Sequence, residues 1–138
     1  GFDILRGGED KDVLRGEAGD DVFNGGGGDD KEYGGAGNDR FLDSDGNDQK
    51  WGDAGADTFV YIATDFGKDR IKDFEFGIDT LDMGNVARGV AFNEQEPLKI
   101  RELKAGVRIE VDANNWVLVE GAELSDFGPN DLITDSVF

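Results

Sequence analysis

The chain has 138 residues, with 32 Asp and Glu against 14 Lys and Arg, no His and no Cys, and a formal net charge of −18. The lack of His and Cys excludes Ser-His-Asp and Cys-His nucleophilic systems, His- or thiolate-bound metals and disulfides. So negative a chain repels DNA, RNA and anionic lipid, and the sequence has no run of 18 apolar residues that predicts a membrane span. The length suits one domain, and this surface would attract a hard cation held by oxygen atoms.

Residues 1–60 repeat with a period of nine, in blocks that begin at positions 7, 16, 25, 34, 43 and 52 after a partial block. The sixth position is aspartate in every block: Asp3, Asp12, Asp21, Asp30, Asp39, Asp48 and Asp57. The eighth position is apolar in five of seven blocks, and fifteen of the 22 glycines lie in this half. Each block therefore predicts a glycine-rich turn followed by a short strand whose middle side chain points inward.

Two blocks would form one turn of a flattened parallel coil, so that equivalent residues of consecutive turns stack about 4.8 Å from each other. One edge then stacks the aspartates at 3, 21, 39 and 57, and the other edge stacks those at 12, 30 and 48. Because stacked carboxylates repel each other, the coil needs cations between its turns. Ca²⁺ fits, since it takes six to eight oxygens and accepts backbone carbonyls. A flexible acidic linker would have no reason to keep this register.

The pattern resembles the RTX (repeats-in-toxin) nonapeptide G-G-x-G-x-D-x-U-x, in which U is a large apolar residue. The resemblance implies an all-β, right-handed parallel β-roll with five to eight Ca²⁺ ions in its turns. One turn would give its Asp with the carbonyls of positions one and three, and the next turn on the same edge its Asp with those of positions two and four. The implied sites are bridged by Asp3/Asp21, Asp21/Asp39, Asp39/Asp57, Asp12/Asp30 and Asp30/Asp48. The implied carbonyl ligands are Gly7, Gly8, Glu9, Gly16, Ala18, Gly19, Gly25, Gly26, Gly27, Gly28, Gly34, Gly35, Ala36, Gly37, Gly46, Gly52, Ala54 and Gly55.

Residues 59–83 continue the pattern with two G-x-D-x-U half-motifs, at 67–71 and 77–81. They place Asp69 and Asp79 one turn plus a small insertion after the aspartates at 48 and 57, so we expect both to bind metal at the ends of the stacks. Asp73 or Asp82 would be a further ligand. The segment resembles the sequence that follows the repeats in type I-secreted RTX proteins, including serralysin-type proteases and mannuronan epimerases.

The remaining residues predict an antiparallel β cap. Strands are expected at 98–103, 107–111 and 116–119, because apolar and charged residues alternate there and a turn lies at 113–115. Residues 120–127 and 130–133 resemble the end of an RTX module, and residues 135–138 resemble the export signal read by a type I exporter. We therefore divide the chain into a β-roll at 1–60 and, at 61–138, a continuation with cap and signal.

Two residues break the apolar pattern of the eighth position, and an aromatic residue follows each of them. Glu32 and Lys50 occupy inward eighth positions one turn apart, and Tyr33 and Trp51 follow them at outward positions. Either these strands are shifted so that the aromatic rings turn inward, or this face packs against another part of a parent protein or binds sugar. Cationic residues also have outward positions on this face: Arg15, Lys31, Arg70 and Lys72.

These features predict a calcium-binding structural module without catalytic residues of its own. At about 2 mM calcium and a Kd of about 10⁻⁴ M, each site adds about 1.8 kcal/mol of stability, which is lost at cytosolic calcium. The N-terminus has neither Met nor an apolar stretch typical of a Sec signal, so we expect the C-terminal part of a larger secreted bacterial protein, such as a protease, lipase or epimerase. Its expected partners are calcium, a type I exporter and the upstream domain. The alternative is an accessory module that binds an alginate-like polysaccharide.

Overall fold

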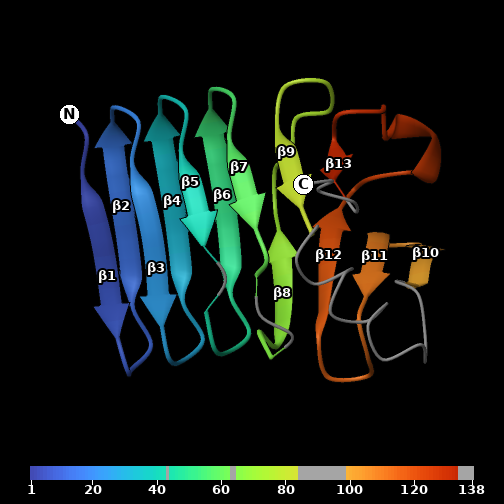
Figure 1. Cartoon of the computed structure of the whole chain (residues 1–138), viewed down its shortest axis with the longest axis horizontal. Helices are drawn as coiled ribbons and strands as arrows, with labels where there is room; N and C mark the ends of the chain where they lie inside the picture. The colour runs from blue at the N-terminus through green and yellow to red at the C-terminus, as the bar shows by residue number, and fades with distance from the viewer. Residues whose placement is uncertain (43, 63–64, 84–98, 134–138) are drawn as a thin grey trace.

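The computed structural model describes residues 1–42, 44–62, 65–83 and 99–133. These residues form thirteen strands and one short 3₁₀ helix, arranged as two parallel layers (Figure 1). None of the helical residues described here forms a segment with the length and apolar character needed to cross a bilayer. The predicted export signal at 135–138 lies outside the described residues.

From β1 to β9 the strands alternate between the two sheets. One sheet has the order β1 (Ile4–Gly8), β3 (Val22–Gly26), β5 (Arg40–Leu42), β7 (Thr58–Val60), β9 (Thr80–Asp82) and β13 (Leu132–Ile133). The other has the order β10 (Lys99–Leu103), β11 (Gly106–Glu110), β12 (Trp116–Glu120), β8 (Lys68–Ile71), β6 (Gln49–Ala54), β4 (Lys31–Ala36) and β2 (Val13–Ala18). Each turn of the coil therefore adds one strand to each sheet, and the predicted parallel β-roll is confirmed.

The nine-residue repeat sets the register between turns. Leu5 lies beside Phe23, Phe23 beside Phe41, and Phe41 beside Phe59, each pair one turn apart in parallel strands. The rings of the three phenylalanines stack with centroids 4.8 Å apart and form the centre of the core. The inward eighth position of the repeat is thus the row that buries apolar area between the sheets.

The coil continues past residue 60 with longer turns. Lys50 of β6 lies beside Ile71 of β8, and Phe59 of β7 lies beside Leu81 of β9. Both pairs are spaced slightly more widely in the sequence than the pairs of the earlier turns. This confirms the expectation that residues 61–83 add a turn with small insertions.

The C-terminal strands extend the same two sheets. β10, β11 and β12 pair in antiparallel fashion, as predicted, but β12 also pairs in parallel with β8, and β13 pairs in parallel with β9. The apolar core runs from Phe23 through Ile71 to Val117 and Val119. This end of the roll therefore has strands laid over both open edges, which protects them from pairing with other chains.

The turns need glycine where the backbone enters the left-handed region and the next turn lies close. Gly37 has φ 141°, and a Cβ at this position would collide with the carbonyl of Gly19 in the preceding turn. Glu17 has φ 71° at a position where the next turn has Gly35. A residue other than glycine is strained in this conformation.

Candidate metal sites

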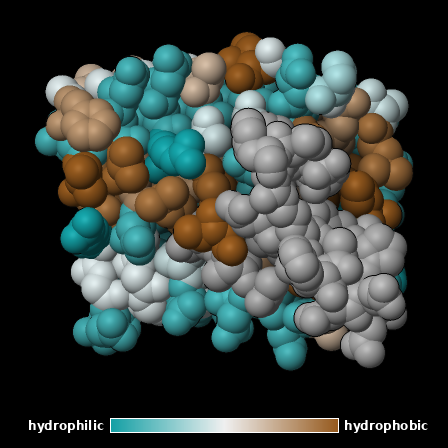
Figure 2. Space-filling model, viewed as in Figure 1, coloured by the Kyte–Doolittle hydropathy of each residue, from teal (hydrophilic) through white to brown (hydrophobic). Residues whose placement is uncertain are grey.

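The repeated aspartates form two hydrogen-bonded rows along the edges of the roll, where the turns lie. The Asp21 edge contains Asp3, Asp21, Asp39, Asp57 and Asp79, and the Asp30 edge contains Asp12, Asp30, Asp48 and Asp69. In each row, Oδ1 of one aspartate accepts a hydrogen bond of 2.7–2.9 Å from the backbone N–H of the aspartate one turn earlier. In the view of Figure 2, hydrophilic residues accordingly lie along both turn edges, with hydrophobic residues between them.

The second oxygen distinguishes the members of these rows. Oδ2 of Asp21, Asp30, Asp39 and Asp57 is buried and accepts no hydrogen bond from any residue that the structure describes. These residues are at most 2% exposed. A buried carboxylate oxygen without a partner is costly, so the arrangement calls for a cation at these four oxygens.

Glycine at the first position makes room for this oxygen, and it is present in every full block except the one that begins with Asp43. A Cβ on Gly34 would collide with Oδ2 of Asp39 and come within 2.6 Å of the carbonyl oxygen of Gly52. A Cβ on Gly16 would meet Oδ2 of Asp21 and the carbonyl oxygen of Gly34 in the same way. We call this space, between the first glycine, its Asp and the carbonyl of the next turn, a turn site. Gly16 and Gly34 do not have positive φ, so glycine is required there for space alone.

The Asp30 edge has the same construction, except that Asp43 and Ser44 stand where the repeat has two glycines. A Cβ on Gly7 would lie 2.7 Å from Oδ2 of Asp12 and would collide with the carbonyl oxygen of Gly25. At the next turn site, Ser44 Oγ is 3.0 Å from the corresponding position on Gly25, and the hydroxyl donates a 2.8 Å hydrogen bond to Oδ2 of Asp48. The serine that replaces a repeat glycine thus takes part in this turn site.

Backbone carbonyls would have to complete any such site. Within the described ranges, no group of three or more acidic side chains comes together in a way that could hold an ion. The first-position carbonyls of Gly25, Gly34 and Gly52 reach the turn sites. The carbonyls of Gly8 and Ala36, also expected as ligands, accept backbone N–H groups of Gly27 and Gly19. A carbonyl oxygen has a second lone pair for a cation.

The last aspartate of each row has both oxygens engaged by the protein. Oδ2 of Asp69 accepts a 2.9 Å hydrogen bond from the Tyr61 hydroxyl, and Oδ2 of Asp79 accepts one of 2.9 Å from the N–H of Glu75. Asp73 accepts hydrogen bonds from the backbone of Gly52 and the residue after it. Asp69 and Asp79 end the rows, as expected, and Asp82 is part of β9.

Burial and mutual repulsion raise the pKa of carboxyl groups in the two aspartate rows. Burial, followed by the charges of Asp79 and Asp39, raises the pKa of Asp57 to about 7. Burial and the charge of Asp69 raise the pKa of Asp48 to about 6. Both effects favour the neutral acid, and a cation between the turns would oppose them.

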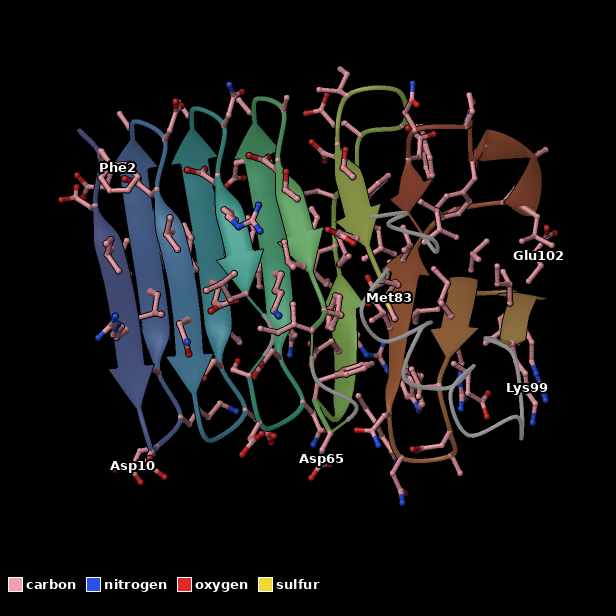
Figure 3. All side chains as sticks on the ribbon, viewed as in Figure 1. Phe2, Asp10, Asp65, Met83, Lys99 and Glu102 are labelled. Atoms are coloured by element: carbon pink, nitrogen blue, oxygen red, sulfur yellow. The ribbon has the colours of Figure 1, made fainter. Side chains whose placement is uncertain are left out.

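A further polar row was missed from the sequence. Asp20 and Asn38 lie at the fifth position of their blocks, and each side chain accepts a backbone N–H from the next turn at 2.8 Å. Asp29 and Asn47 do the same on the other edge, at 3.0 and 3.1 Å. The signal was available, since Asp or Asn occupies this position in four blocks. Asp10 and Asp65, labelled in Figure 3, lie at turns of the Asp30 edge.

Glu32 and Lys50 point into the roll and Tyr33 and Trp51 point out of it, as an unshifted repeat predicts. Glu32 and Lys50 are fully buried, and Tyr33 and Trp51 stack on the outer face with ring centroids 4.4 Å apart. Of the alternatives that the sequence left open, the shifted strand pair is therefore wrong. Arg15 lies 4.4 Å from the Tyr33 ring centroid, and Lys72 lies 5.9 Å from that of Trp51.

Comparison with known proteins agrees with this geometry. A family model of the RTX calcium-binding nonapeptide repeat (four copies) matches residues 1–32 and 33–60. The chain is similar to the solution structure of the AlgE6R3 subunit from the Azotobacter vinelandii mannuronan C5-epimerase, with a TM-score of 0.67 and 26% identity, covering 96% of this chain and 84% of that chain. No curated protein matches. Residues 1–60 are therefore RTX calcium-binding nonapeptide repeats, and the described residues as a whole form a parallel β-roll similar to that solved structure.

Proposed function

We propose that this chain is a structural module that folds when it meets extracellular calcium. The observation that carries the proposal is the set of four buried Oδ2 atoms, on Asp21, Asp30, Asp39 and Asp57, that accept no hydrogen bond from the described residues. A Ca²⁺ ion supplies positive charge and bonds to oxygens of consecutive turns. The aspartates and first-position carbonyls hold it, and the glycines keep the space open.

The low calcium of the cytosol leaves these carboxylates facing one another across each turn. With the pKa of Asp57 raised to about 7, ionising the rows at neutral pH opposes folding. Millimolar calcium outside the cell reverses this balance. Such a module would pass a type I exporter unfolded and then fold, which would stabilise the larger exoprotein that carries it. The match of residues 1–60 to RTX repeats supports this role.

Circular dichroism of the purified chain tests the calcium switch. The chain in metal-free buffer should have little β structure and should gain it cooperatively as Ca²⁺ is added to millimolar concentration. Mg²⁺ at the same concentration should fail, since it requires a smaller octahedral site and sheds water reluctantly. A metal-free spectrum already rich in β structure, unchanged by calcium, would overturn the proposal.

A second function, binding of an acidic polysaccharide, is favoured by one specific surface. Arg15, Tyr33 and Trp51 lie in register on β2, β4 and β6, and Lys72 follows on the same face. Stacked rings flanked by cations suit sugar rings that carry carboxylates. The likeness to a subunit of a mannuronan C5-epimerase supports the same class of ligand.

The two tryptophans allow this second function to be tested with one reporter. In the Trp116→Phe variant, Trp51 is the remaining tryptophan, and alginate titrated into the calcium-loaded protein should change its fluorescence. The Trp51→Phe variant, which retains Trp116, should show no change, and a neutral glucan should have no effect on either. An alginate response in the Trp51→Phe variant but none in Trp116→Phe would exclude this surface.

A further inference from the structure

Asp69 is the last aspartate of the Asp30 edge, and we call it and its contacts the Asp69 rung. This rung differs from every turn site before it. Lys50 extends into the roll from β6, and its Nζ lies 3.3 Å from Oδ2 of Asp69. The Tyr61 hydroxyl donates a 2.9 Å hydrogen bond to the same oxygen. Lys50, Asp69 and Tyr61 are all completely buried. The oxygen that is left without a hydrogen bond in Asp21, Asp39 and Asp57 faces an ammonium group here.

The surroundings of this ammonium group consist of the ligand types that a cation takes. Besides Asp69, Nζ of Lys50 lies 3.9 Å from Oε2 of Glu32 and donates a 3.4 Å hydrogen bond to the carbonyl of Leu42. The ring of Tyr61 lies under it, with the centroid 4.9 Å away. A buried ammonium group is stable only when it is paired in this way.

Calcium and this ammonium group cannot both be bound to Asp69. Ca²⁺ lies about 2.3–2.6 Å from its oxygen ligands, so an ion on Oδ2 would be close to Nζ of Lys50, with three positive charges in a buried space. Oδ1 of Asp69 is already bonded to the backbone N–H of Asp48 at 2.9 Å. The residues at this rung therefore do not fit the metal, although those at the earlier turn sites do.

We infer that the ammonium group of Lys50 is the resident cation of the Asp69 rung and that Asp69 binds no calcium. The lysine is part of the chain, so its charge is present at any calcium concentration. This rung joins β6 to β8, and β8 pairs with β12 of the C-terminal strands. The junction between the roll and its C-terminal strands is thus fixed without an external ion. The inference goes beyond the proposed calcium switch, which depends on the earlier turns.

Two measurements on the intact chain locate the ions. Native mass spectrometry of calcium-loaded protein should give the same number of bound Ca²⁺ ions for wild type and Asp69→Asn, and a smaller number for Asp39→Asn. Anomalous scattering from wild-type crystals grown with Tb³⁺ should place ions beside Asp21 and Asp39 and none on Asp69. An ion bound to Asp69, or a calcium lost from the Asp69→Asn variant, would overturn the inference, whether or not that variant is fully stable.

A double-mutant cycle tests the role of the lysine itself. Lys50→Met leaves Asp69 and Glu32 buried without a cation, so its melting temperature at saturating calcium should fall by about 10 °C. The double variant Lys50→Met/Asp69→Asn should be more stable than the sum of its single changes predicts. Additive effects would contradict the pairing. Intact mass must equal the sequence mass, since a deficit of one water molecule would mean an amide bond between Lys50 and Asp69 in place of an ammonium group.

Discussion

The backbone N–H of Asp21 donates a 2.8 Å hydrogen bond to Oδ1 of Asp39, one turn later in the roll. Oδ2 of Asp39 accepts no hydrogen bond from the described residues and faces Gly34. The two oxygens of one carboxylate therefore have separate tasks: one joins consecutive turns and the other is available to a metal. An amide retains the first task and loses the second, which makes the tasks experimentally separable.

Asp39→Asn should weaken calcium binding and leave the coil geometry intact. The amide oxygen can still accept the N–H of Asp21, but the charge that attracts the ion is gone. The calcium concentration at the midpoint of folding should rise about tenfold, equivalent to about 1.4 kcal/mol. Calcium titration followed by circular dichroism measures this midpoint.

Asp20→Asn is the matched control for this change. Asp20 is exposed and accepts the N–H of Asn38 at 2.8 Å, so the same substitution removes the same charge beside the same kind of backbone bond. Its midpoint should change less than twofold. Equal midpoint shifts in the two variants would mean that overall charge, and not the buried oxygen, governs calcium binding.

Gly34→Ala should close a turn site by steric overlap. The added methyl group would occupy the space between Oδ2 of Asp39 and the carbonyl oxygen of Gly52. At least one bound ion should be lost by native mass spectrometry, and folding should need more calcium. Gly27→Ala is the control, because a Cβ there makes contacts of 3.5 Å or longer and its φ is not positive. If both variants retain the wild-type number of ions, the turn site is wrongly placed.

The parallel coil could be predicted because a strict repeat of nine fixes several properties at once. Aspartate at the sixth position and phenylalanine at the eighth define both the turn edge and the buried row, and the stacking of Phe23 on Phe41 follows from the register. The spacing also placed Asp69 and Asp79 correctly in their rows. A repeat predicts the register, the buried row and the aspartate rows together because each block faces the same environment one turn later.

What the repeat could not provide depends on contacts between different blocks. The bond from Tyr61 to Asp69 joins a side chain outside the nine-residue register to one inside it, so no spacing signals it. The parallel pairing of β12 with β8 joins segments that lie far apart in the sequence, and alternation of apolar residues in β12 is the same whichever neighbour it takes.

Glu17→Gly should stabilise the calcium-loaded roll. Glu17 is exposed and held at φ 71°, a conformation that costs a residue with a Cβ roughly 1–2 kcal/mol. After the greater flexibility of unfolded glycine is subtracted, a gain of about 1 kcal/mol remains. The melting temperature should rise by about 3–5 °C. In Glu9→Gly, where φ is not positive, the same change should lower it, and a rise in both variants would mean that charge relief, not backbone strain, is the cause.

Acid should partly replace calcium in the ion-free protein. Burial and then the charges of Asp79 and Asp39 raise the pKa of Asp57 to about 7, against 3.8 as its ordinary value. A raised pKa in the folded state means that the protonated acid stabilises the fold fully below about pH 3.8. This contribution is lost as the pH rises through about 7. In metal-free buffer, β structure measured by circular dichroism should therefore be greater at pH 4.5 than at pH 7.5.

The calcium-loaded protein and the Asp57→Asn variant separate this titration from a general effect of net charge. With calcium bound, β structure should be the same at pH 6 and pH 7.5, because the ion offsets the repulsion that raised the pKa. Without calcium, Asp57→Asn should retain more β structure than wild type at pH 7.5, since its amide cannot ionise. If the variant and the wild type lose structure equally between pH 4.5 and pH 7.5, the charge of the whole chain, and not the buried row, is what calcium must overcome.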